Sequence, residues 1–153
     1  MLNSRVGTQP AAAVVYHPLK TDLARLRSVV GRFQSANGWS PTRWYPTAEA
    51  DSGTGAARQA VSDGANMVLA AGGDGTVRAV AEVLRGSGIP LAVVPLGTGN
   101  LLARNIGMPL GDIDGAVRAA FQGANRPIDL GVITITREDE SEDEHVFLVL
   151  AGM

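Results

Sequence analysis

The sequence Gly-Gly-Asp-Gly-Thr at residues 72–76 constrains this chain most, because it joins an apolar run at 67–71 to a helix-like stretch at 77–84. Glycines let the main chain approach a phosphate closely, and a helix N-terminus adds about half a positive charge. Asp74 would repel a phosphate directly. It therefore indicates either a cation such as Mg²⁺ between the two groups or removal of a proton from an attacking hydroxyl. The loop predicts phosphoryl transfer.

Apolar strand-like runs alternate with helix-like segments through the first 126 residues. We expect strands at 11–16, 39–45, 67–71 and 91–94. Helices are expected between the cap residue Asp22 and the stop at Asn37, at 56–62 with a start up to one turn earlier, and at 77–84, 101–105 and 112–122. Because the strands are apolar without alternation, they predict a parallel sheet covered by helices on both faces, which is an α/β fold.

Three of the predicted loops leave the carboxyl ends of strands, where open parallel sheets bind ligands. They begin at His17-Pro18, at the glycine loop, and at Pro95–Asn100, which reads Pro-Leu-Gly-Thr-Gly-Asn. A single glycine loop could be only a tight turn. Two Gly/Thr loops at one edge, one of them carrying Asp74, favour a phosphate-binding edge instead.

Composition excludes several other classes of protein. The chain of 153 residues has 45% apolar and 18% charged residues, which is typical of one globular domain with a core. It has no cysteine, so disulfides, thiolate metal sites and a cysteine nucleophile are excluded. The basic residues are scattered without aromatic neighbours, which argues against nucleic-acid binding. No apolar run approaches the roughly 18 residues that span a bilayer, and no signal peptide is evident, so we expect a cytoplasmic location.

The pattern changes after residue 126. Segments 128–136 and 145–151 read as two strands of an antiparallel hairpin, with Asp129 at its start. Six of the 15 acidic residues lie within 138–144, and we expect them to form a solvated hairpin tip, which leaves 13 basic and 9 acidic residues in 1–137. We expect residues 1–126 to form the α/β domain and residues 127–153 to be the first strands of a second, β-rich domain that continues beyond this chain.

The two glycine loops together resemble the catalytic domain of diacylglycerol kinases, which bacterial lipid kinases and the sphingosine and ceramide kinases share. The matching segments are residues 72–77 and 95–104. Weaker matches lie at Val15–Pro18, at Thr47–Gly55, at Asp129–Gly131 and at Phe147–Gly152, so the likeness spans about residues 11–152. NAD kinases and phosphofructokinases share the first loop but not the second.

The resemblance implies ATP and Mg²⁺ as cofactors and a lipid hydroxyl as acceptor, at a transient membrane contact on the cytoplasmic face. The implied cofactor-binding residues are His17, Thr47, Gly72, Gly73, Asp74, Gly75, Thr76, Gly97, Thr98, Gly99 and Asn100. Among them, Gly72, Gly73, Gly75 and Thr76 would contact the ATP phosphates, and Thr98 and Asn100 would line the acceptor side. Asp74 is the implied catalytic residue and holds Mg²⁺ directly or through phosphate or water. The acceptor lipid and the oligomeric state stay open.

The chain departs from the family pattern at three places. His17 replaces the usual Asn, Arg78-Ala79 replace a frequent Asn-Glu, and Leu101 replaces a frequent Asp. Arg78, Ala79 and Leu101 keep open a nucleotide-sensing module without catalysis. A kinase of a soluble acceptor such as NAD or a sugar phosphate is a second alternative, against which the loop at 95–100 argues. Trp39 and Trp44 are interpreted as packing residues. We expect the 153-residue chain alone to be inactive or nearly so.

Overall fold

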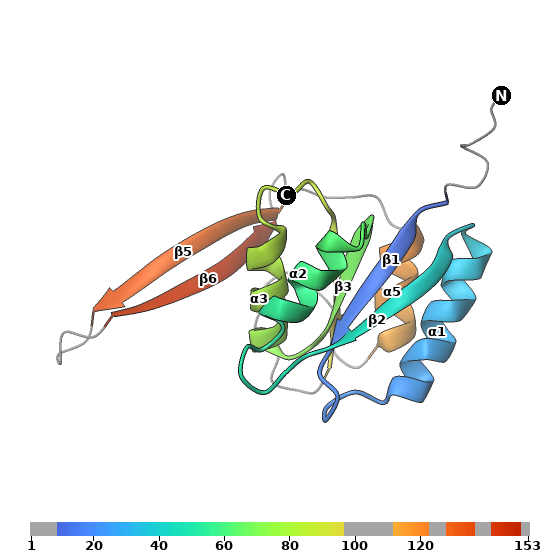
Figure 1. Ribbon diagram of the computed structural model, residues 1–153, viewed down its shortest axis with the longest axis horizontal. Coiled ribbons are helices and arrows are strands. Elements are labelled where there is room, and N and C mark those ends of the chain that lie inside the picture. Colours follow the sequence, from blue (N-terminus) through green and yellow to red (C-terminus); the bar gives the residue numbers. More distant parts are fainter. Residues whose placement is uncertain (1–8, 97–111, 123–127, 137–141, 151–153) are drawn as a thin grey trace.

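The computed structural model describes residues 9–96, 112–122, 128–136 and 142–150. Its main sheet has four parallel strands in the order β2-β1-β3-β4 (Figure 1). The strands are β1 (Ala11–Tyr16), β2 (Ser40–Pro46), β3 (Met67–Gly72) and β4 (Leu91–Pro95). The predicted α/β class is therefore confirmed.

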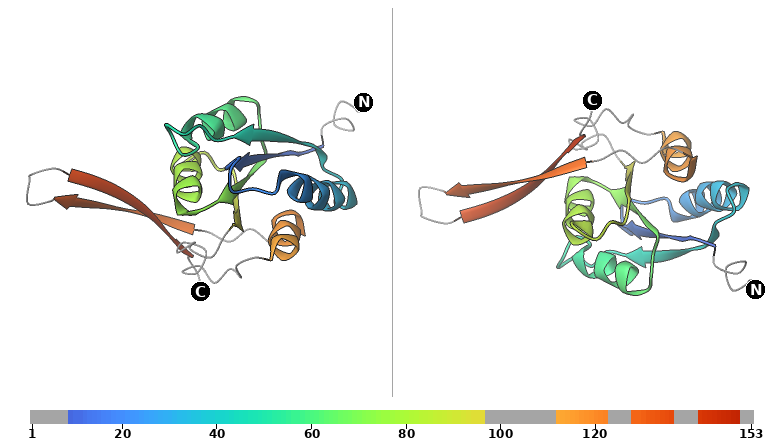
Figure 2. Two further views of the ribbon diagram at one scale, coloured as in Figure 1. Left: turned by 90° about the horizontal axis from the view of Figure 1, so that it is seen from below. Right: turned by 90° about the horizontal axis from the view of Figure 1, so that it is seen from above.

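Helices cover both faces of this sheet, as predicted. They are α1 (Leu23–Ala36), α2 (Thr54–Ser62), α3 (Asp74–Leu84) and α5 (Ile113–Gln122). α2 and α3 lie on one face, while α1 and α5 lie on the other (Figure 2). The predicted helix at 101–105 lies outside the described residues.

The core follows the two-residue alternation of the strands. Along β3, Val68 and Ala70 pack toward α2 and α3, whereas Leu69 and Ala71 pack toward α1 and α5. All six residues of β3 are buried, because this central strand has a helix layer on each side. The order of the sheet thus puts the strand that carries the glycine loop in the middle of the molecule.

Both tryptophans are packing residues, as the sequence indicated. Trp39 meets the ring of Phe121 edge to face at 5.3 Å, and Trp44 meets Tyr16 in the same way at 6.1 Å. All four rings belong to the hydrophobic cluster beneath α1 and α5. Such edge-to-face pairs add to the burial of apolar area.

The predicted ends of α1 are confirmed. Its cap residue Asp22 accepts a hydrogen bond from the backbone N–H of Arg25 at 3.2 Å. At the other end Asn37 is the C-cap, and Gly38 has a φ of 73°, in the left-handed region that favours glycine.

One helix begins earlier than the sequence predicted. α3 starts at Asp74 instead of Val77, whereas α2 starts at Thr54, within the turn before Ala56 where its start was also expected. The residues Asp74-Gly75-Thr76 thus form the first turn of α3, with Gly73 as its N-cap. An acidic side chain in a first turn is stabilised by the helix dipole, which explains why the helix extends into the glycine loop. The longest described helix, α1, has 14 residues, and none of the described helices could span a bilayer.

The second sheet is an antiparallel hairpin of β5 (Ile128–Thr136) and β6 (Glu142–Leu150), which extends away from the α/β part in Figure 1. The hairpin was predicted, but the start of its second strand at 145 was wrong. Glu142 to Glu144 pair with Thr136 to Thr134 instead of lying in the tip. Thr134, Ile135 and Thr136 on the facing strand have high β propensity, which favours strand pairing along these three acidic residues. The other acids, at 138–140, lie outside the described residues.

Candidate functional site

The four strands end together at one edge of the sheet. Tyr16 pairs with Pro46 on one side and with Ala71 on the other, and Gly72 pairs with Pro95. Three backbone hydrogen bonds continue this ladder into the loops: Thr47 N–H to Tyr16 O (2.9 Å), His17 N–H to Ala71 O (3.1 Å) and Leu96 N–H to Gly72 O (3.3 Å). The predicted convergence of loops at this edge is confirmed for the described residues.

The loop after β4 is described only as far as Leu96. The predicted residues Gly97, Thr98, Gly99 and Asn100 lie outside the described residues. Because Leu96 hydrogen-bonds to Gly72, the chain enters that loop directly beside the start of the glycine loop.

The glycine loop has a buried layer and a partly exposed layer. Gly72 and Thr76 are buried, and Thr76 is only 4% exposed. A Cβ on Gly72 would lie 2.8 Å from Thr76 Oγ1, so the threonine side chain packs directly over this glycine. Gly73, Asp74 and Gly75 are partly exposed at the N-terminus of α3. The surface that a ligand could meet is therefore formed by these three residues.

The loop between β2 and α2 packs against the same place. Its Thr47 is 9% exposed, and a Cβ on Gly53 would lie 3.2 Å from Thr47 Cγ2 and 3.9 Å from Thr76 Cγ2. The two threonines, the buried polar residues of the described part of the chain, thus meet around Gly53. Gly53 has a φ of 125°, a conformation that L side chains rarely adopt.

Asp51 and Ser52 shape this loop, and the sequence analysis did not single them out. The carboxylate of Asp51 accepts the backbone N–H groups of Gly53 and Gly55, each at 3.0 Å. Ser52 has a φ of 55°, which is unusual for a residue other than glycine, and such strain is often found at functional sites. Its Oγ lies 3.9 Å from the position of a Cβ on Gly75. The available signal was the turn-forming run Asp-Ser-Gly.

The loop between β1 and α1 is held by His17. Its Nδ1 accepts the N–H of Leu19 at 3.2 Å, and its backbone oxygen accepts Lys20 N–H (3.2 Å) and the Thr21 hydroxyl (2.6 Å). The side chain of His17 is therefore used within its own turn. Lys20, which the sequence analysis also did not single out, brings Nζ to 3.9 Å from the position of a Cβ on Gly73.

The carboxylates offer little to a metal ion on their own. Within the described ranges, no group of three or more His, Cys, Asp or Glu side chains could hold a metal ion. Asp51 already accepts two backbone N–H groups. A cation at Asp74 would therefore need most of its ligands from phosphate oxygens or water, which is how Mg²⁺ is usually bound at phosphate sites.

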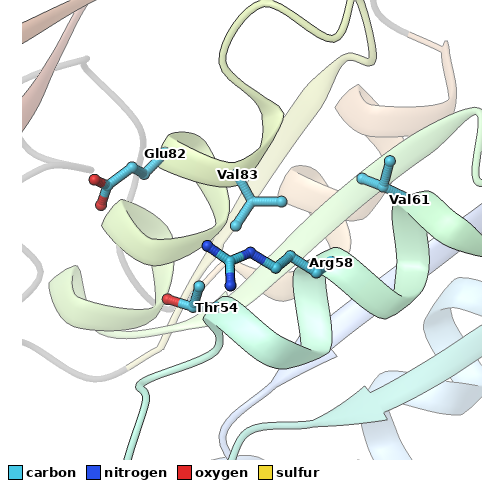
Figure 3. Close-up of a pocket in the computed structure, with 5 residues that line it drawn as sticks. All are labelled: Thr54, Arg58, Val61, Glu82 and Val83. Carbon is cyan, nitrogen blue, oxygen red and sulfur yellow. The ribbon is translucent and has the colours of Figure 1, made fainter.

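A groove of about 550 Å³ lies elsewhere, between α2 and α3. Thr54, Arg58, Val61, Glu82 and Val83 line it (Figure 3). Arg58 extends from α2 toward α3, while Glu82 points away from α2. None of the predicted site residues lines this groove, so we place the candidate site at the sheet edge, where the loops converge.

These features define an α/β domain of the class that binds ligands at the carboxyl edge of a parallel sheet. The chain belongs to the diacylglycerol kinase catalytic domain family, whose model matches residues 12–133. This confirms the resemblance inferred from the two glycine loops.

Individual relatives agree with this assignment. The chain is 33% identical to a diacylglycerol kinase of Bacillus subtilis over 127 residues, which are 80% of this chain and 41% of that protein. It is 47% identical over 77 residues, 49% of this chain and 25% of the relative, to a Pseudomonas aeruginosa protein named "Probable lipid kinase YegS-like". The crystal structure of a diacylglycerol kinase from Bacillus anthracis shares the fold, with a TM-score of 0.64 and 22% identity over 82% of this chain and 43% of that one. This chain thus spans less than half the length of these relatives.

Proposed function

We propose that this chain is the nucleotide-binding part of a lipid kinase that transfers the γ-phosphate of ATP to a lipid hydroxyl. One observation carries the proposal: the loops after β1 and β4 are hydrogen-bonded to Ala71 and Gly72, directly beside the partly exposed Gly73 and Gly75 at the N-terminus of α3. The family match supports the reaction class. The names of the relatives from B. subtilis and P. aeruginosa support a lipid acceptor such as diacylglycerol.

The edge fits a phosphate chain. Gly73 and Gly75 present no side chain, so phosphate oxygens can approach the first N–H groups of α3. His17 and Thr47 frame the edge from the loops after β1 and β2. Thr76 and Gly72 lie underneath and fix the loop by packing. The family resemblance assigns the acceptor side to the loop that contains Gly97, Thr98, Gly99 and Asn100.

Asp74 is the residue to which we assign Mg²⁺, held jointly with the phosphates. Bound there, Mg²⁺ would supply neutralisation of the phosphate charge. We assign Asp74 this positioning role because phosphoryl transfer depends mainly on alignment and charge stabilisation, with little work for a base. The partial exposure of Asp74 in the first turn of α3 is consistent with this role.

The division of the chain and its location belong to the same proposal. Residues 1–126 would form the nucleotide-binding domain, and residues 127–153 would be the first strands of a β-rich lipid-binding domain. The whole protein would act peripherally, at the cytoplasmic face of the membrane, where its lipid acceptor lies. The independent four-stranded sheet and the separate β5–β6 hairpin are consistent with that boundary.

Titration of the 153-residue chain with ATP, with and without Mg²⁺, tests the nucleotide site. We expect Mg²⁺ to raise the affinity of the natural chain for ATP and to have no such effect on the Asp74→Asn variant. Glu82→Gln is the matched control, because it removes one negative charge from the same helix at an exposed position. Equal Mg²⁺ effects in Asp74→Asn and Glu82→Gln would overturn the role of Asp74.

A kinase assay of the whole protein tests which class of acceptor is phosphorylated. The protein encoded by the whole reading frame should phosphorylate at least one lipid in a panel of diacylglycerol, sphingoid bases and phosphatidylglycerol, and not NAD. Asp74→Asn should lower that turnover by about 100-fold or more, as loss of a group that stabilises transition-state charge does. Phosphorylation of NAD instead of lipids would replace the lipid-kinase proposal with the soluble-acceptor alternative.

A further inference from the structure

Lys20 places a positive charge beside a helix end that is already positive. Its Nζ lies 3.9 Å from the position that a Cβ on Gly73 would occupy, and Gly73 is the N-cap of α3. A cation near a helix N-terminus is disfavoured, because the dipole there has the same sign. Asp74 in the first turn offsets part of this charge. An anion between the ammonium and the helix would make both groups favourable.

The turn that carries Lys20 is fixed at its base. Lys20 N–H and the Thr21 hydroxyl both donate to the backbone oxygen of His17, and His17 N–H donates to Ala71 at the end of β3. The start of this turn is therefore attached to the strand that leads into the glycine loop. The side chain of Lys20 is exposed, so its ammonium can meet a ligand that enters from solvent.

We propose that Lys20 contacts a phosphate group of the nucleotide at the N-terminus of α3. This inference rests on the proposed function, and it adds a phosphate-binding residue from a different loop. A lysine ammonium is a compact point charge that commonly binds phosphate, while backbone N–H groups of the helix fix the position of the oxygens. The phosphate would thus be held from two sides, by α3 and by the β1–α1 loop.

The experiment compares Lys20→Gln with Arg85→Gln in the 153-residue chain. Arg85 is exposed at the C-terminal end of α3, so its removal changes the net charge equally but far from the glycine loop. ATP, ADP and adenosine are titrated into each variant by calorimetry, and thermal melting confirms that each is folded. A charge-assisted hydrogen bond is worth about tenfold in affinity or more.

We expect Lys20→Gln to weaken ATP and ADP binding by about tenfold and to leave adenosine binding unchanged. Lys20→Arg should retain most of the affinity, and Arg85→Gln should match the natural sequence. If the natural chain binds ATP and Lys20→Gln binds it equally well, the role of Lys20 is overturned and the proposed function stands. If the natural chain binds no nucleotide, both proposals are overturned.

A second arm separates the nucleotide from a lipid phosphate, which has the same chemistry. Vesicles of phosphatidylcholine with and without phosphatidic acid are sedimented with the natural chain and with Lys20→Gln. We expect the two proteins to bind both vesicles equally. Loss of binding to phosphatidic acid vesicles in Lys20→Gln, with unchanged ATP affinity, would assign Lys20 to the membrane and overturn its nucleotide role.

Discussion

The side chain of Thr76 covers Gly72, so that a Cβ at position 72 would lie 2.8 Å from Thr76 Oγ1 and 2.9 Å from Thr76 Cβ. Gly72 is the last residue of β3, and Thr76 lies in the first turn of α3. The first glycine of the loop is thus required by packing within the protein, where the helix turns back over the strand. Gly73 and Gly75 are the two that leave space for a ligand.

Gly72→Ala should therefore destabilise the fold. Neither the buried Thr76 nor the strand can move easily, and overpacking of this kind costs about 1–3 kcal/mol of unfolding free energy. Denaturant unfolding measures the change. Gly31→Ala is the control, because a Cβ there meets nothing within 4 Å and Gly31 lies inside α1. That substitution should stabilise by up to about 1 kcal/mol through helix propensity. A Gly72→Ala protein as stable as the natural one would contradict the packing account.

Asp51→Ala should loosen the loop between β2 and α2. It removes the acceptor of two backbone N–H groups, those of Gly53 and Gly55, at the start of α2. Loss of such a capping carboxylate costs about 1 kcal/mol and up to about 2 kcal/mol. Asp51→Asn keeps one acceptor oxygen and should lie between the two. Equal unfolding midpoints for all three proteins would show that these hydrogen bonds do not hold the loop.

The pair of Tyr45 and Asp63 predicts a pH effect on stability. The Tyr45 hydroxyl donates to Asp63 Oδ2 at 2.7 Å; this hydrogen bond, followed by that from Gln59, holds the pKa of Asp63 below its ordinary value of 3.8. Burial, followed by the same hydrogen bond, raises the pKa of Tyr45 above 10.0. A carboxyl group whose folded pKa is lowered adds stability above about pH 4, and that stability is lost as the pH falls through the folded pKa.

Tyr45→Phe should therefore have a lower free energy of unfolding than the natural chain at neutral pH. The difference between the two free energies should become smaller below about pH 4. The raised pKa of Tyr45 acts at the other end of the range, where its stabilising effect is lost as the pH rises above 10.0 through the folded pKa. Urea unfolding across this range measures both. Gln59→Ala, which leaves the Tyr45 hydrogen bond intact, should show a smaller change at low pH. If the difference in unfolding free energy between Tyr45→Phe and the natural chain stays constant from about pH 3 to neutral pH, the Tyr45–Asp63 hydrogen bond does not cause the pH effect.

Local sequence determined most of the α/β fold. The strands at 11–16 and 67–71 could be predicted because each is a short, wholly apolar run between breakers, which fits only a strand buried on both faces. The capped helix α1 could be predicted from its apolar spacing and from Asp22. The glycine loop itself could be recognised from five consecutive residues. These features depend on neighbours in the chain, which a sequence displays directly.

Tertiary structure alone decided which side chains meet at the glycine loop. Lys20 reaches Gly73 because β1 lies beside β3, and Ser52 reaches Gly75 because the loop after β2 packs over the same edge. Neither residue stands in a pattern that reveals its partner, since the contacts join segments far apart in sequence. Strand order and register, which result from burying both faces of the sheet at once, bring these residues together. The physical reason is that this proximity is a property of the whole packed sheet, whereas the glycine loop is a property of one short segment.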